Sequence, residues 1–178
     1  CDSGFARVQT PYYCILINLS NGGPKYQKGH SHADFLSYEV SNLYSKVIVN
    51  TGISTYDDNA TREKERSAKS HNTVLIDERN PLELWAAFRV ARRSSISDLK
   101  IKTSNDLITI TGTVLLYWSK GKGSFHERTW ELSSKQICIT DKLGPDVKHA
   151  CASTHFHPDL IQTVGSKQES IFSHQSRT

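Results

Sequence analysis

An all-β fold, an antiparallel two-sheet β-sandwich, is the fold class that this sequence predicts, and three observations predict it. Short runs rich in β-branched and aromatic residues recur along the whole chain. Turn signals such as Ser-Asn-Asp at 104–106 and Gly-Lys-Gly at 121–123 separate these runs at short intervals. No segment repeats its apolar residues with the period of a helix. About a dozen strands joined in this way indicate two packed antiparallel sheets.

The first half of the chain contains several predicted strands and one long charged loop. The strands cover residues 4–10, 12–18, 35–40, 45–50 and 71–77. A glycine-rich segment, 21–29, leads into a histidine cluster that precedes the third strand. Residues 54–70 are rich in charge and poor in apolar side chains, so we expect a long, basic, mobile loop there. His71 then lies at a junction between loop and strand, where binding groups are common.

The second half reads as a series of strands as far as residue 164. They cover residues 86–93, 99–103, 107–116, 125–132, 136–141, 148–156 and 160–164. His126 and Arg128 share one face of the 125–132 strand, and we expect that face to meet solvent. The last eight or so residues are expected to be frayed or truncated.

Length and composition indicate one soluble domain. The chain has 178 residues, 37% hydrophobic and 22% charged, and no apolar run is long enough to span a membrane. Its net charge of +4 is compatible with an acidic ligand such as an anionic polysaccharide or nucleic acid. An ordinary solvated basic surface explains the same charge.

The four cysteines, Cys1, Cys14, Cys138 and Cys151, are widely spaced, which excludes a zinc ribbon and a Cys-x-x-Cys redox motif. We expect free thiols, although an oxidising compartment would allow one or two disulfides whose pairing the sequence leaves open. The start at Cys1 and the absence of methionine predict a piece of a longer protein. A mature lipoprotein beginning at Cys1 is the second interpretation.

Potential ligands are densest in residues 30–34, His-Ser-His-Ala-Asp. On an extended segment, His30, His32 and Asp34 would share one side, because side chains alternate with a period of two. Imidazole binds zinc and exchanges protons near neutral pH. This segment therefore predicts a metal or acid–base site, and the alternative is a polar turn with surface histidines.

Three blocks of sequence resemble the heparinase II/III-like domain of polysaccharide lyases in order and spacing. They are Gly29 to Ser37, Val47 to Gly52 followed by Tyr56, and Arg66-Ser67 with Ser70 to Val74; Asp2 to Phe5 and Thr154 to Pro158 extend the likeness over most of the chain. The resemblance implies that residues 1–178 form a single β-sandwich domain, the C-terminal part of a longer chain whose N-terminal α/α toroid is missing. It also implies β-elimination on a uronic-acid-containing anionic polysaccharide, such as a glycosaminoglycan or alginate.

The same resemblance implies the roles of individual residues. His30 matches a catalytic histidine at the cleft edge, while His32, position 50 and His71 match a zinc site. Here the chain departs from the family pattern, because Asn50 stands where the family usually has Asp. A neutral amide is a weaker zinc ligand than a carboxylate, so zinc would be held weakly.

Tyr56, Arg62 and Arg66 are candidate substrate-binding residues, since a guanidinium binds carboxylates in a fork. An aromatic packed at a strand end and solvated loop charges are the competing interpretations. Family members take their principal base and carboxylate binders from the toroid, so this fragment alone is expected to be inactive. The expected partners are the polysaccharide and the toroid, without nucleic acid, in a periplasmic or secreted protein.

Two rival functions remain at this point. A non-catalytic carbohydrate-binding sandwich would share the fold without the reaction. A metal-dependent hydrolase of the metallo-β-lactamase type carries His-x-His-x-Asp-His, but this chain has Phe35 at the sixth position and lacks alternating helices.

Overall fold

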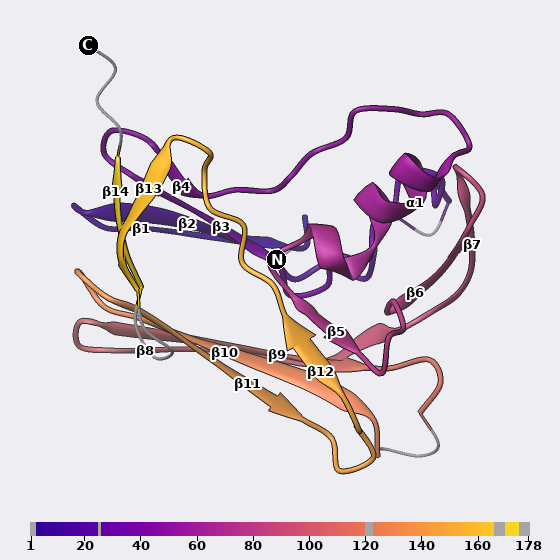
Figure 1. The fold of residues 1–178 in the computed structure, drawn as a ribbon. Helices are drawn as coiled ribbons and strands as arrows, with labels where there is room; N and C mark the ends of the chain where they lie inside the picture. Colours follow the sequence, from indigo (N-terminus) through magenta and orange to yellow (C-terminus); the bar gives the residue numbers. More distant parts are fainter. Residues whose placement is uncertain (1–2, 25, 120–122, 166–169, 175–178) are drawn as a thin grey trace.

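Two four-stranded antiparallel sheets face each other in the computed structural model, which describes residues 3–24, 26–119, 123–165 and 170–174 (Figure 1). The first sheet runs β1 (Phe5–Gln9), β2 (Tyr13–Asn18), β3 (Tyr38–Asn42) and β4 (Lys46–Ile48). The second runs β11 (Ile137–Leu143), β10 (Phe125–Leu132), β9 (Leu107–Leu115) and β8 (Ser95–Ser104). The prediction of an all-β antiparallel sandwich is confirmed.

Three two-stranded pairs complete the described strands. They are β5 (Val74–Ile76) with β12 (Ala150–Ala152), β6 (Leu82–Trp85) with β7 (Arg89–Arg93), and β13 (Leu160–Gly165) with β14 (Ser170–His174). The β6–β7 hairpin stands on the same side of the sandwich as the helix α1 (Figure 1). It is this side that carries the histidines described below.

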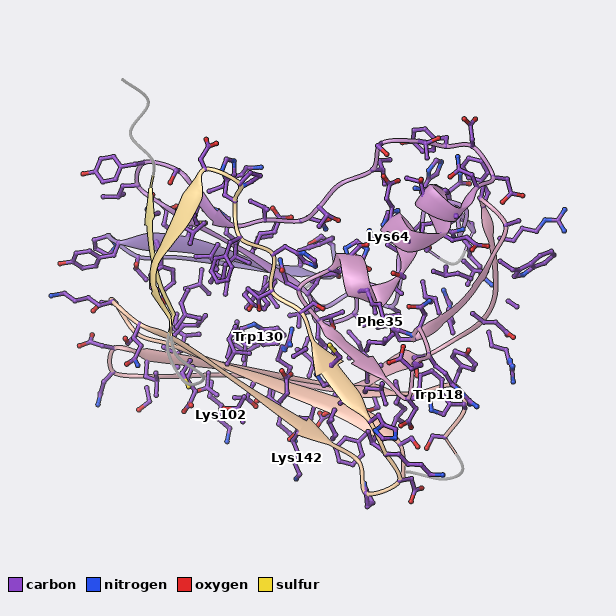
Figure 2. The ribbon with its side chains drawn as sticks, viewed as in Figure 1. Phe35, Lys64, Lys102, Trp118, Trp130 and Lys142 are labelled. Atoms are coloured by element: carbon purple, nitrogen blue, oxygen red, sulfur yellow. The ribbon has the colours of Figure 1, made fainter. Side chains whose placement is uncertain are left out.

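Side-chain alternation builds the core between the sheets. Ile15 and Ile17 of β2 are fully buried, as is Trp130 of β10, which lies between the two layers in Figure 2. Lys102 and Lys142 point away from the interior on the outer side of the second sheet (Figure 2). Period-two patterning thus places each sheet's apolar face inward.

The prediction of a structureless loop over residues 54–70 is wrong for its second half. Helix α1 covers Ala60–Arg66 and a 3₁₀ turn covers Ala68–Ser70. Asn59 caps the helix, its side chain accepting a hydrogen bond from the Arg62 backbone amide at 2.9 Å. No apolar stripe marked this helix because its buried side is formed by Arg62 and Arg66, one helical turn apart.

Two strand predictions also need correction. The predicted strand at 86–93 is the second half of a hairpin whose first strand, β6, the sequence reading missed. Of the last eight or so residues, expected to be frayed, 171–174 belong to β14 and pair with β13, while residues 175–178 lie outside the described residues.

His126 and Arg128 are buried, so the prediction that they face solvent is wrong. They occupy every second position of β10 together with Trp130 and Leu132, and all four are buried. These residues therefore share the face of β10 that points inward, between the two sheets. Arg128 donates to both carboxylate oxygens of Asp141, at 2.7 and 2.9 Å, and to the carbonyls of Leu36 at 2.9 Å and Asn72 at 2.7 Å. One guanidinium therefore joins the second sheet to two loops of the histidine side.

Leu36 fits against the second sheet because β9 has a glycine there. A Cβ on Gly112 would meet Leu36 Cδ2 at 2.7 Å, and Gly112 is the register partner of Arg128. Leu36 itself has φ of +56°, a left-handed conformation that is uncommon for a residue with a side chain. Its carbonyl bond to Arg128 and its full burial hold that conformation.

The described thiols Cys14, Cys138 and Cys151 are free, and Cys1 lies outside the described residues. None of the described helices has the length and apolar character needed to cross a bilayer.

Replacing Arg128 with Met is expected to lower the free energy of unfolding by about 3 kcal/mol, because it leaves buried carbonyls and a partly buried carboxylate without their donor. Urea denaturation measures the change. Lys142→Gln, an exposed cation removed from the neighbouring strand, is the control and should change stability little. Equal stabilities of the two variants would contradict the role given to Arg128.

Acid should destabilise the fold through His126 and Asp141. Burial lowers the pKa of His126 below its usual 6.5, in spite of the hydrogen bond to Asp141. Burial alone would raise the pKa of Asp141, but hydrogen bonds from His126 and Arg128 outweigh it and hold the pKa below the usual 3.8. Folding therefore favours the neutral ring and the ionised carboxylate.

The stabilisation is complete above pH 6.5 and decreases as the pH falls, first because unfolded His126 binds a proton, and again below 3.8 for Asp141. Urea unfolding at about pH 7.5 and 5.5 should show this loss, and the loss should be smaller in His126→Gln, which has no ring to protonate. Identical losses in the two proteins would exclude His126 as the source.

Candidate functional site

Residues 30–34 form an irregular segment between β2 and β3, and their side chains alternate as predicted. Ser31 and Ala33 are buried, whereas His30 is exposed. A cleft of about 570 Å³ is lined by His30, His32 and Asp34 together with the glycine turn at 21–24. The cleft brings these three side chains together as expected, but Ser31, expected on the other side, lines it as well.

His32 and His71 lie together, as the sequence predicted. His32 Nδ1 is 3.2 Å from His71 Nε2, and the Arg62 guanidinium lies 3.4 Å from the other ring nitrogen of His32. Because a guanidinium can only donate, neutral His32 accepts at Nε2 and donates from Nδ1 to His71. A directed chain of hydrogen bonds thus runs from Arg62 through His32 to His71.

Both rings are held in their neutral form. Burial, reinforced by the charges of Arg62 and Arg66, lowers the pKa of His32 to about 4. Burial and the neighbouring His32 and His155 lower the pKa of His71 to about 3. Near neutral pH, both imidazoles are therefore unprotonated, which is the state that binds metal.

Asn72 fixes the loop that carries His71. Its side-chain amide donates to the carbonyls of Tyr38 at 2.8 Å and Val49 at 3.0 Å, and its oxygen accepts from the His155 backbone amide at 2.7 Å. Thr73 adds a 2.6 Å bond to the Phe35 carbonyl. Three separate segments are thereby tied to the residue that follows His71.

Arg62 and Arg66 lie in the interior rather than on the surface. Arg62 is 0% exposed and Arg66 1% exposed. Arg66 donates to the carbonyls of Ser31 at 3.2 Å and of Ala86 and Ala87 at 2.9 Å each. Their charges therefore act on the site from behind, and the Nη2 atom of each has no hydrogen-bond partner among the described residues.

His30 and Tyr56 come together at the edge of the cleft. Their ring centroids are 6.1 Å apart in an edge-on arrangement, and Phe88 lies 5.9 Å from His30 and parallel to Tyr56. The Arg62 guanidinium lies 5.2 Å from the centre of the Tyr56 ring, within the range of a cation–π interaction. Tyr56 is thus half-exposed above a buried cation, next to the predicted catalytic histidine.

Asn50 is exposed, and its side-chain oxygen accepts a 3.1 Å hydrogen bond from the Gly52 amide. The adjacent Thr51 donates to the Ser70 carbonyl at 2.8 Å, which brings this segment beside the His71 loop. Among the described residues, no three His, Cys, Asp or Glu side chains converge into a metal-binding group. The structure thus assembles two of the three predicted ligands.

Two residues outside the predicted ligand and substrate-binding sets contribute to the site, although the sequence had already placed Asp34 beside His30 and His32. Asp34 accepts a 2.9 Å hydrogen bond from Asn18, and burial raises the pKa of Asp34 to about 6. Phe88, from the β6–β7 turn, closes the aromatic group around His30. The first follows from Asp34's position in the histidine segment, whereas the hairpin that places Phe88 left no clear sequence signal.

A family model described as Heparinase II/III-like, C-terminal, matches residues 1–177. The chain belongs to this family. No curated protein matches it. Among solved structures, a mutant of heparan sulfate lyase HepC from Pedobacter heparinus is similar, with a TM-score of 0.61 and 16% identity over 84% of this chain. A second HepC structure from that organism gives a TM-score of 0.54 and 18% identity over 74% of the chain.

This heparinase II/III-like chain spans about a fifth of each of those proteins, 22% of the first and 18% of the second. At such identities the likeness concerns the fold. It agrees with the two-sheet arrangement described above.

Proposed function

We propose that this chain is the sandwich half of a polysaccharide lyase that cleaves a uronic-acid-containing anionic polysaccharide by β-elimination. Family membership supports the class of protein. The observation that carries the proposal is the position of His30, exposed at the mouth of the 570 Å³ cleft with Tyr56 beside it and buried cations behind. We propose further that an N-terminal helical toroid completes the enzyme, which is periplasmic or secreted.

The reaction needs three things from the site: a base for the C5 proton, a proton for the C4 leaving oxygen and stabilisation of the sugar carboxylate. A base removes the C5 proton, a double bond forms between C4 and C5, and the C4–O bond breaks as the leaving oxygen gains a proton. The C5 proton is acidic enough only when the sugar carboxylate is stabilised as charge develops on it. In this proposal His30 and Tyr56 donate hydrogen bonds to the sugar at the cleft edge, while the toroid supplies the principal base.

Arg62 and Arg66 contribute by charge rather than by direct contact. Both guanidiniums are buried, so their positive potential reaches the cleft through a protein interior in which charges are poorly screened. A cationic field of this kind attracts an anionic chain and favours negative charge on the reacting carboxylate. In this proposal, Arg62 and Arg66 act on the substrate by long-range attraction of its negative charges.

A weak zinc site at His32 and His71 is part of the proposal. Two nitrogen ligands of a tetrahedral zinc ion are separated by about 3.3 Å, given Zn–N bonds of about 2.0–2.1 Å, and the two ring nitrogens are 3.2 Å apart. The third predicted ligand fits zinc poorly, because the Asn50 side chain is neutral and its oxygen accepts a hydrogen bond from the Gly52 amide. A metal on His32 Nδ1 would also place the ring hydrogen on Nε2, facing the Arg62 donor. When bound, zinc would fix the two loops in place.

The His30→Ala variant tests the catalytic role. In the enzyme that includes the toroid, turnover should fall by about 10²- to 10³-fold, the usual loss when a donor to developing negative charge is removed. Ultraviolet absorbance of the unsaturated product measures turnover on heparan sulfate, alginate and hyaluronan. Because His30 is exposed, the melting temperature should not change.

His149→Ala, at another exposed histidine, is the control for that experiment and should leave turnover unchanged. Unaltered turnover in His30→Ala would remove His30 from the mechanism. Polysaccharide binding without cleavage by the complete protein would instead favour a non-catalytic carbohydrate-binding module.

Asn50→Asp should tighten zinc binding by at least about tenfold, or about 1.4 kcal/mol, because it adds the missing negative charge. The substitution keeps the oxygen that accepts the Gly52 bond, so the local fold should survive. Calorimetric zinc titration compares the two forms, with His71→Ala as the variant that should bind in neither background. Equal affinities would place residue 50 outside the coordination shell, and no binding by either form would exclude a metal site.

A further inference from the structure

The turn between β6 and β7 is held in a strained conformation by buried charges. It consists of Ala86, Ala87 and Phe88, and Ala86 has φ of +52°, in the left-handed region. Arg66 donates to both alanine carbonyls, and Arg62 Nε donates to that of Ala87 at 3.4 Å. Two fully buried guanidiniums are thus used to fix one surface turn.

The turn and the strand end before it present aromatic rings to solvent. Trp85 is 49% exposed and Phe88 45% exposed. The Arg89 guanidinium lies 4.5 Å from the centre of the Trp85 ring. Strained backbone that serves an exposed aromatic surface is typical of a binding site, since the packing of the core gains little from it.

The turn also continues the edge of the His30 cleft. Phe88 contacts His30 and Tyr56 through ring–ring interactions at 5.9 and 6.1 Å. Phe88 therefore joins the hairpin to the aromatic group that includes the cleft residue His30.

We propose that Trp85, Phe88 and Arg89 form an accessory binding surface that holds a sugar unit of the anionic polysaccharide away from the unit that reacts. This inference rests on the proposed function. The flat C–H face of a pyranose ring packs against an aromatic ring, and a guanidinium beside it binds a carboxylate or sulfate. Charge complementarity supports this occupant, because Arg89 lies on the aromatic surface whereas Arg92 of the same hairpin is already paired with Glu83 at 2.7 Å.

In the protein of residues 1–178, tryptophan fluorescence can report this surface selectively. The chain has three tryptophans, of which Trp130 is 0% exposed and Trp118 is partly buried, so acrylamide quenching comes mainly from Trp85. Heparan sulfate or alginate oligosaccharides should reduce quenching in the wild-type protein. In Trp85→Phe, which keeps an aromatic ring, binding should persist while the protection of fluorescence disappears.

Affinity electrophoresis in gels containing each polysaccharide measures binding itself. Trp85→Ala and Phe88→Ala should each weaken binding by about tenfold, and Arg89→Gln should do so for anionic chains. The matched controls are Tyr44→Ala, a 92% exposed aromatic at the β3–β4 turn, and Lys142→Gln, an exposed cation on the second sheet. Neither control should change retention.

The outcomes separate this inference from the proposed function. If the complete enzyme cleaves the polysaccharide but the Trp85 and Phe88 variants bind as the wild type does, the accessory surface is excluded and the lyase stands. Equal retention by neutral dextran would overturn the assignment of an anionic ligand. Failure of the complete protein both to bind and to cleave anionic polysaccharides would overturn both proposals.

Discussion

The geometry of the histidine side depends on the buried guanidinium of Arg128. This one group neutralises Asp141 and binds the carbonyls of Leu36 and Asn72, each next to or near one of the paired histidines in sequence. Guanidinium is suited to this place, because its planar fork satisfies several acceptors at once and stays charged. An apolar side chain of similar size would fill the space but would leave the two loops without hydrogen bonds to the second sheet.

Much of the fold could be read from the sequence, because alternation and turn residues are local signals. Most strands, though not β6 or β14, and the meeting of residues 30–34 with His71 were predicted. Helix α1 was missed, since its buried side is made of Arg62 and Arg66 and contains no apolar stripe. Arg128 was misplaced for a related reason, although its position on the same face of the strand as Trp130 and Leu132 indicated burial. Residues whose burial depends on distant carbonyls cannot be recognised by hydrophobic pattern.

Cations gather around the histidine pair, and this shapes what the site can hold. Arg62 and Arg66 are both buried behind His32, and their charges contribute to its lowered pKa. The same charges that keep the rings neutral oppose a second cation between them. The site therefore combines imidazoles ready to bind metal with surroundings that favour an anion, and Asn50 adds no negative charge to change that balance.

The bonds of Arg128 also determine when the site can form. They connect residues 92 and 56 positions apart in the chain. Contacts of such long range are slow to form, because the loop must close before any bond rewards it. During synthesis the histidines emerge long before β10 and β11, so the early chain carries His30, His32 and His71 without the geometry that joins them. The bonds that fix the Leu36 and Asn72 loops can therefore form only after the C-terminal half of the chain has been made.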